Sequence, residues 1–200
     1  MKKIMMMAAF MVAALTANAQ GAVGTFSIQP KVGFNLSTIT NNTDFGDSKL
    51  RVGLVGGIEG EYVFAEKVSV AAAALYSVQG CSYDVNGTDY VRTTLDYINI
   101  PVVANYYIAP GFALKAGIQP GFLMGAKVKI KADGSKSETD VKDYCKTFDL
   151  SVPLGASYEI QDFVFDVRYN LDVLKLNKEG SKSEHNSVIQ FTLGYKFPVK

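Results

Sequence analysis

Apolar and polar residues alternate strictly along the stretch Ser187–Phe197. Ile189, Phe191, Leu193 and Tyr195 are separated by polar residues or glycine. Successive side chains of a β-strand point to opposite faces, so the stretch predicts a strand with one apolar and one polar face. Its length also suits a strand that crosses a bilayer at a tilt. The pattern therefore indicates a membrane-spanning strand.

The same alternation recurs along the chain and predicts eight strands. They cover residues 26–37, 50–64, 68–80, 93–108, 112–130, 148–159, 163–172 and 187–197. The stretch 93–108 holds two apolar sets of opposite parity, and we take the set from Ile98 to Ile108 as the outward one. Three connections are short, around residues 65–67, 109–111 and 161–162. Four are long and polar, residues 38–49, 81–92, 131–147 and 173–186.

Outer-membrane barrels combine short periplasmic turns with long extracellular loops. We therefore predict an all-β fold, an eight-stranded antiparallel transmembrane up-and-down β-barrel with both termini in the periplasm. A soluble β-sandwich would show similar alternation. Two features favour the barrel: aromatic residues gather at the strand ends beside the short turns, and the apolar faces of six or seven strands hold no charge.

The N-terminal segment is typical of a secretory signal peptide. Lys2 and Lys3 precede an apolar run from Ile4 to Leu15, and Ala17-Asn18-Ala19 forms a small-x-small cleavage site. We expect a signal peptide over residues 1–19 and one outer-membrane β-barrel domain over residues 20–200. Without the two lysines, 18 basic residues face 19 acidic ones, a formal charge of −1 that argues against a nucleic-acid partner.

Three runs of sequence resemble outer-membrane β-barrel proteins of Bacteroidetes, often called PorT-like or porin-family proteins. Leu95–Tyr107 (LDYINIPVVANYY) is similar to the family's Tyr-x-x-Ile-Pro strand with an aromatic end, and Phe26–Ser37 and Leu193–Phe197 are also similar. The resemblance implies a small barrel of the OmpA/OmpX type, and it implies no single activity. Phe197 is followed by Pro198-Val199-Lys200, whereas the barrel-assembly signal commonly ends on the aromatic residue.

The polar faces of the predicted strands carry charges that would line the lumen. Eight strands enclose a space that side chains can fill, so we expect these groups to pair in a structural network that plugs the barrel. The alternatives are a narrow ion path, or an acid/base pair formed by Glu59 with Glu61 or by Asp166 with Glu159. The predicted network consists of Lys31, Arg51, Glu59, Glu61, Lys115, Lys127, Asp149, Glu159, Asp166, Arg168 and Lys196.

Two further pairs of residues suggest chemistry at the loops. His185 and Ser187 resemble the His-x-Ser pair of outer-membrane lipid A deacylases, but no acid follows Glu184, and we expect a loop histidine. Cys81 and Cys145 would both lie at the outer side, either as a disulfide or as two thiols. Two cysteines and one histidine fall short of a structural zinc set, so we expect neither a metal nor a cofactor.

These observations predict a non-enzymatic outer-membrane protein with a structural or surface-interaction role and a plugged lumen. A small pore is the second hypothesis and a lipid A-modifying barrel enzyme is the third. We expect a monomer in outer-membrane lipid, inserted by the barrel-assembly machinery, with any extracellular partner bound through the long loops.

Overall fold

The computed structural model describes residues 22–40, 50–84, 90–132, 135–174 and 185–199. The predicted signal peptide, residues 1–19, lies outside them. The elements, in chain order, are β1 (Phe26–Thr40), β2 (Arg51–Ala65), β3 (Val68–Asp84), β4 (Tyr90–Asn99), β5 (Val102–Ala109), β6 (Phe112–Ala132), β7 (Ser135–Asp140), the 3-10 helix η2 (Lys142–Tyr144), β8 (Phe148–Ile160), β9 (Phe163–Asp172), β10 (His185–Tyr195) and β11 (Phe197–Val199). No helix among the described residues is long and apolar enough to cross a membrane.

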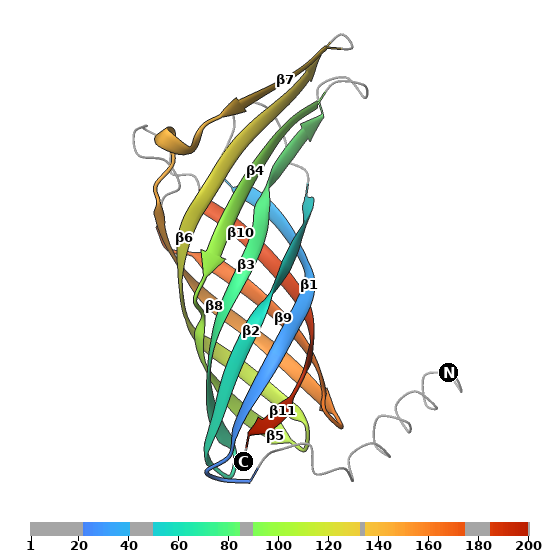
Figure 1. Cartoon of the computed structure of the whole chain (residues 1–200), viewed down its shortest axis with the longest axis vertical. Coiled ribbons are helices and arrows are strands. Elements are labelled where there is room, and N and C mark those ends of the chain that lie inside the picture. Colours follow the sequence, from blue (N-terminus) through green and yellow to red (C-terminus); the bar gives the residue numbers. More distant parts are fainter. Residues whose placement is uncertain (1–21, 41–49, 85–89, 133–134, 175–184, 200) are drawn as a thin grey trace, which may run out of the picture.

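The strands form a closed antiparallel cylinder (Figure 1). Closure occurs where β1 pairs with β10 from Lys31 opposite Gly194 to Thr40 opposite His185, and β11 continues the pairing along Phe26–Ile28. The described chain makes eight passes around the wall, because β4 with β5 and β10 with β11 form one pass each and β7 pairs only with β6. The predicted eight-stranded antiparallel β-barrel is confirmed.

Pro101 divides the predicted strand over residues 93–108 into β4 and β5. Proline has no N–H to donate to the ladder, so regular pairing stops there. The neighbouring contacts continue across the gap, because Ala73 N donates to Pro101 O at 3.0 Å and Ile100 N donates to Pro120 O at 2.8 Å. The pass therefore keeps its place in the wall although the ladder is interrupted.

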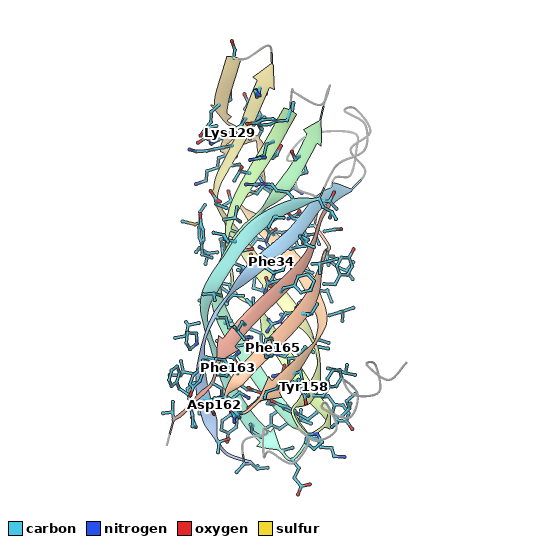
Figure 2. All side chains as sticks on the ribbon, turned by 90° about the vertical axis from the view of Figure 1, so that its right-hand side faces the viewer. Phe34, Lys129, Tyr158, Asp162, Phe163 and Phe165 are labelled. Atoms are coloured by element: carbon cyan, nitrogen blue, oxygen red, sulfur yellow. The ribbon has the colours of Figure 1, made fainter. Side chains whose placement is uncertain are left out.

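Apolar side chains cover the outer face of the cylinder and polar side chains fill its inside. Phe34, Phe163 and Phe165 project outward (Figure 2) and are 43–50% exposed. The outward parity expected for the pass over 93–108 is confirmed, since Val102 and Tyr106 are exposed while Leu95, Tyr97 and Asn99 are buried inside. An apolar exterior is the surface that a lipid-facing barrel needs.

The two ends of the cylinder differ. The turn end carries the three tight connections between β2 and β3, β5 and β6, and β8 and β9, together with both ends of the described chain. At the other end, β3, β4, β6 and β7 rise beyond the remaining strands (Figure 1). We call this four-stranded extension the projecting sheet; it comprises residues 80–84, 90–95, 126–132 and 135–140.

The projecting sheet corrects the expected loops over residues 81–92 and 131–147. Most of the described residues in these two segments are strand, because β3, β4 and β6 continue past the barrel and β7 pairs with β6. The helix η2 lies in the second segment. Residues 41–49 and 175–184, which include most of the other two long connections, lie outside the described residues.

A β-bulge in β6 changes which side chains face inward. Asp96 pairs with Gly125 and Tyr97 with Leu123, so β6 has one extra residue, Met124. Beyond the bulge Ala126 is buried and Lys127 is exposed, the reverse of the predicted parity. The prediction that Lys127 faces the lumen is wrong for this reason.

Candidate functional site

The middle of the lumen is occupied by five charged side chains from four strands. We call Lys31, Glu59, Lys115, Asp166 and Arg168 the central cluster; each is at most 6% exposed. Lys31 Nζ lies 2.7 Å from Glu59 Oε1, and Lys115 Nζ lies 2.6 Å from Asp166 Oδ2. Arg168 Nη2 donates to both Glu59 and Asp166 at 2.8 Å. Three cations and two carboxylates give the cluster a formal charge of +1.

A second group of ionised side chains lies towards the turn end. Lys196 Nζ contacts Glu159 Oε2 at 2.5 Å and Glu61 Oε2 at 3.0 Å. Glu61 also accepts hydrogen bonds from the Tyr107 hydroxyl at 2.7 Å and from Ser69 Oγ at 2.5 Å. This turn-end cluster of Glu61, Glu159 and Lys196 has a formal charge of −1, so the two clusters together are neutral.

The two clusters join opposite walls of a narrow barrel by ion pairs. Glu59 and Glu61 belong to different clusters, and so do Asp166 and Glu159, so neither proposed acid/base pair is brought together. Tyr107, an aromatic residue beside the short turn at residues 109–111, is buried inside the barrel and donates a hydrogen bond to Glu61. In both clusters each carboxylate lies against at least one cation, so the ion pairs neutralise the buried charge.

A layer of amides and hydroxyls lies between the central cluster and the projecting sheet. Asn186 Nδ2 donates to Gln79 Oε1, Gln79 Nε2 to Ser77 Oγ at 2.9 Å, and Asn35 Nδ2 to Ser77 Oγ at 2.9 Å. Sequence reasoning did not single out these residues, although most share the inward parity of the charges. Across the described chain, eleven buried side-chain polar atoms have no protein hydrogen-bond partner, which favours water in the lumen.

At the sheet end the lumen becomes partly apolar. Leu95, Tyr97, Leu123 and Ala126 form a buried cluster, and Val141 and Cys145 from the segment around η2 pack against it. Arg51 Nη1 lies nearby and donates to Gln79 O at 2.5 Å and to Thr93 O at 3.0 Å. Asp149 pairs with Gly121 and Asp172 pairs with Ser151 at the same end. Arg51 and Asp149 thus lie at the mouth, away from the central cluster.

The projecting sheet carries its own charges. Lys127 and Lys129 each place Nζ 2.9 Å from Glu138, with all three side chains exposed. Hydrogen bonds from these lysines hold the pKa of Glu138 below its ordinary value. The Arg92 guanidinium lies 5.2 Å from the centroid of the Tyr90 ring. The sheet is therefore a charged surface at the end of the barrel, where Lys129 is visible in Figure 2.

The remaining predicted residues also lie at this end. Both cysteines are thiols in the structure, Cys81 buried and Cys145 half-buried. His185 begins β10, where its backbone pairs with Thr40, but its side chain lies outside the described residues, as does Glu184. The His-x-Ser hypothesis therefore stays a prediction.

Comparison with known proteins gives the family. The model of the family "Outer membrane protein beta-barrel domain" matches residues 18–173. No match was found among curated proteins.

Two solved structures show a similar fold. The attachment invasion locus protein Ail of Yersinia pestis has 16% identity and a TM-score of 0.53, with 88% of this chain and 100% of Ail covered. Neisserial surface protein A has 15% identity and a TM-score of 0.50, with coverages of 89% and 100%. The chain thus belongs to the outer membrane protein β-barrel domain family and is a transmembrane β-barrel of the bacterial outer membrane.

Proposed function

We propose that this protein is a non-enzymatic surface-interaction barrel: a plugged cylinder that holds the projecting sheet outside the cell for binding a partner. The observation that carries the proposal is the continuation of β3, β4, β6 and β7 beyond the barrel wall. A rigid strand scaffold that raises a charged sheet above the lipid suits recognition. The protein then acts as a monomer in outer-membrane lipid after insertion by the barrel-assembly machinery.

The proposal includes an orientation. Both ends of the described chain lie at the turn end, and barrels of this membrane have short periplasmic turns. With both termini in the periplasm, the projecting sheet faces the outside. The run Leu95–Tyr107 supports the finer assignment to the PorT-like proteins of Bacteroidetes.

One face of the projecting sheet is suited to an anionic partner. Cross-strand pairing puts Arg92 opposite Lys129, and Lys129 opposite Glu138 on the next strand. Lys127 and Lys131 occupy the same face of β6, where alternate residues point the same way. Asp140 pairs with Lys127, so among the side chains that the structure describes on this face four cations outnumber two carboxylates. We therefore propose an anionic surface polymer, such as a sulfated glycan, as the partner class.

A sulfated probe tests the proposal. Ail has been solved with the heparin analogue sucrose octasulfate, and the basic row here makes that compound a suitable first ligand. The triple variant Arg92→Gln/Lys129→Gln/Lys131→Gln in nanodiscs should bind roughly a hundredfold more weakly, given about 1 kcal/mol per basic residue near an anionic surface. Glu138→Gln should bind more tightly, because it removes a carboxylate from the same face. Binding that ignores both changes, or no binding by the native protein, contradicts the proposal.

Conductance separates the plugged barrel from the alternative of a small pore. The ion pairs of the central cluster cross the lumen, so we expect no stable channels above background in planar bilayers. Stable channels formed by the native protein would favour the pore and contradict the plug. Lipid A that is unchanged in mass when the protein is expressed is the result expected of a non-enzyme.

A further inference from the structure

We propose that a cleft beside Tyr90 on the projecting sheet binds one sugar ring of the anionic polymer, with the ring stacked on the tyrosine. This inference rests on the proposed function and deepens it, because it assigns the recognition of sugar to one cleft. The recognition of charge then belongs to the cations around that cleft. A polyanion that lacks sugar rings would bind through those cations alone.

The cleft lies on the face that carries the basic side chains. Its volume is about 270 Å³, and its lining residues are Tyr90, Lys129, Ile130, Ser137 and Glu138. Lys129 pairs with Glu138, and their neighbours Ile130 and Ser137 pair with each other in the next row. Successive side chains of a strand point to opposite faces, so Ile130 and Ser137 contribute backbone to the floor. The side chains of Tyr90, Lys129 and Glu138 form the walls.

The Tyr90 ring gives the cleft an aromatic wall. The Arg92 guanidinium lies 5.2 Å from the centroid of this ring, but Arg92 does not line the cleft, so the two meet different parts of the ring. The face of an aromatic ring carries partial negative charge. It therefore attracts the polarised C–H bonds on one face of a pyranose and repels a sulfate or carboxylate. This wall suits the sugar ring rather than its acidic groups.

The opposite wall carries one donor and one acceptor. Lys129 Nζ and Glu138 Oε2 are 2.9 Å apart, and both side chains are partly exposed. The ammonium donates and the carboxylate accepts, so the pair suits neighbouring sugar hydroxyls, which do both. Lys127 Nζ also lies 2.9 Å from Glu138, and the two lysines offset the repulsion between this carboxylate and an anionic polymer. An apolar wall with a few convergent polar groups is typical of a small-molecule site.

Cations flank the cleft where the neighbouring sugars of a polymer would lie. Arg92 follows Tyr90 by two residues on the same face of β4, and Lys131 pairs with Tyr90 across the sheet. Leu95 and Tyr97 are buried inside the barrel, so Tyr90 and Arg92, which have the opposite parity, continue its outer face. The cleft therefore opens away from the lumen, and a long polymer can lie across it without entering the mouth.

Two probes of equal charge test the cleft. Calorimetry in nanodiscs compares a heparin tetrasaccharide with a polyvinyl sulfate oligomer of the same charge, which has no sugar ring. Tyr90→Leu should weaken binding of the tetrasaccharide roughly five- to tenfold and change binding of polyvinyl sulfate by less than about twofold. Tyr90→Phe keeps the ring and should bind both probes as the native protein does. Tyr144→Leu is the matched control, because Tyr144 is 77% exposed and does not line the cleft.

The salt dependence of binding adds a second readout. Tyr90→Leu removes no charge and should leave it unchanged, whereas the triple charge variant of the proposed function should reduce it for both probes. Heat-modifiable electrophoresis shows whether each variant is folded, and Tyr90→Thr, which keeps a residue that favours strands, serves if the leucine variant is not.

The outcomes separate the cleft from the charged surface. Tyr90→Leu that binds the tetrasaccharide as the native protein does, or that loses both probes equally, overturns the sugar cleft while the charged surface stands. A native protein that binds neither probe overturns the proposed function and the cleft with it.

Discussion

Replacing Asp166 by Asn isolates the charge of the central cluster, because the two side chains have nearly the same shape. Asp166 Oδ2 lies 2.6 Å from Lys115 Nζ and 3.4 Å from Lys31 Nζ, and Arg168 donates to both carboxylate oxygens at 2.8 Å. Without this carboxylate, Glu59 alone faces three buried cations and the cluster charge rises from +1 to +2. We expect a large loss of stability with little change in packing.

The magnitude follows from the burial of the cluster. Removing one partner of a buried ion pair typically costs about 3–5 kcal/mol, because the other charge stays buried without compensation. Asp166 contacts three cations and is 2% exposed, so we expect a loss in the free energy of unfolding at the upper part of this range. Adding Lys115→Met returns the cluster charge to +1 and should recover stability, with a coupling energy of about 0.5–3 kcal/mol.

Urea unfolding of the refolded barrel in lipid vesicles, followed by far-UV circular dichroism and electrophoretic mobility, measures these energies. Asp162→Asn is the matched control, because the same substitution at an exposed turn should change stability by no more than about 0.5 kcal/mol. A loss at Asp166 as small as that of the control would refute the reasoning. Simple additivity of Asp166→Asn and Lys115→Met would refute the charge argument specifically.

Three further outcomes can be checked. Gly33→Ala places a Cβ 1.9 Å from the Phe191 carbonyl oxygen at the closing seam and should destabilise the barrel by about 1–3 kcal/mol. Gly56→Ala, whose Cβ would have its nearest neighbouring atom at 3.4 Å, should destabilise the barrel less, and urea unfolding compares the two variants. Tyr107→Phe removes a buried hydrogen bond to a carboxylate and should cost about 1.5–3 kcal/mol in the same assay. Because the pKa of Glu138 is lowered, its ion pairs stabilise the sheet at pH values above the ordinary carboxyl pKa. This stabilisation is lost as the pH falls through the lower pKa of the folded state. NMR titration of this carboxyl should show a midpoint below that of Glu138 in an unfolded peptide.

Alternation alone predicted most of the barrel wall, because burial on one face imposes a period of two on each strand. It failed where that period is interrupted. Phe122, Leu123 and Met124 are consecutive apolar residues, and only pairing with β4 shows that the bulge lies there. Beyond it the predicted strand continued to residue 130 with the wrong face inward, and the polarity of residues 131–147 suggested a loop because strands outside lipid need no apolar face.

The sequence predicted which charged residues point into the lumen, but it did not predict which of them contact each other. Parity indicates that Lys31, Glu59 and Asp166 point inward, but their pairing depends on the stagger of the closed cylinder. Lys31 and Asp166 are 135 residues apart and meet only after β1 closes against β10. The sequence gives no sign that both amide atoms of Asn170 and the Oδ1 atom of Asn186 lack hydrogen-bond partners. An asparagine on the polar face of a strand is ordinary.

Lys196 has a consequence for the order in which the cylinder is completed. It interrupts the last pass between β10 and β11, and its ammonium reaches Glu61 on β2 and Glu159 on β8, while its backbone N–H donates to Asp162 O at 2.7 Å. A single residue thus fastens the final strand to walls on both sides of the seam. These contacts can form only when both walls are in place. Lys196 therefore stabilises the closed barrel relative to a barrel that is open at its seam.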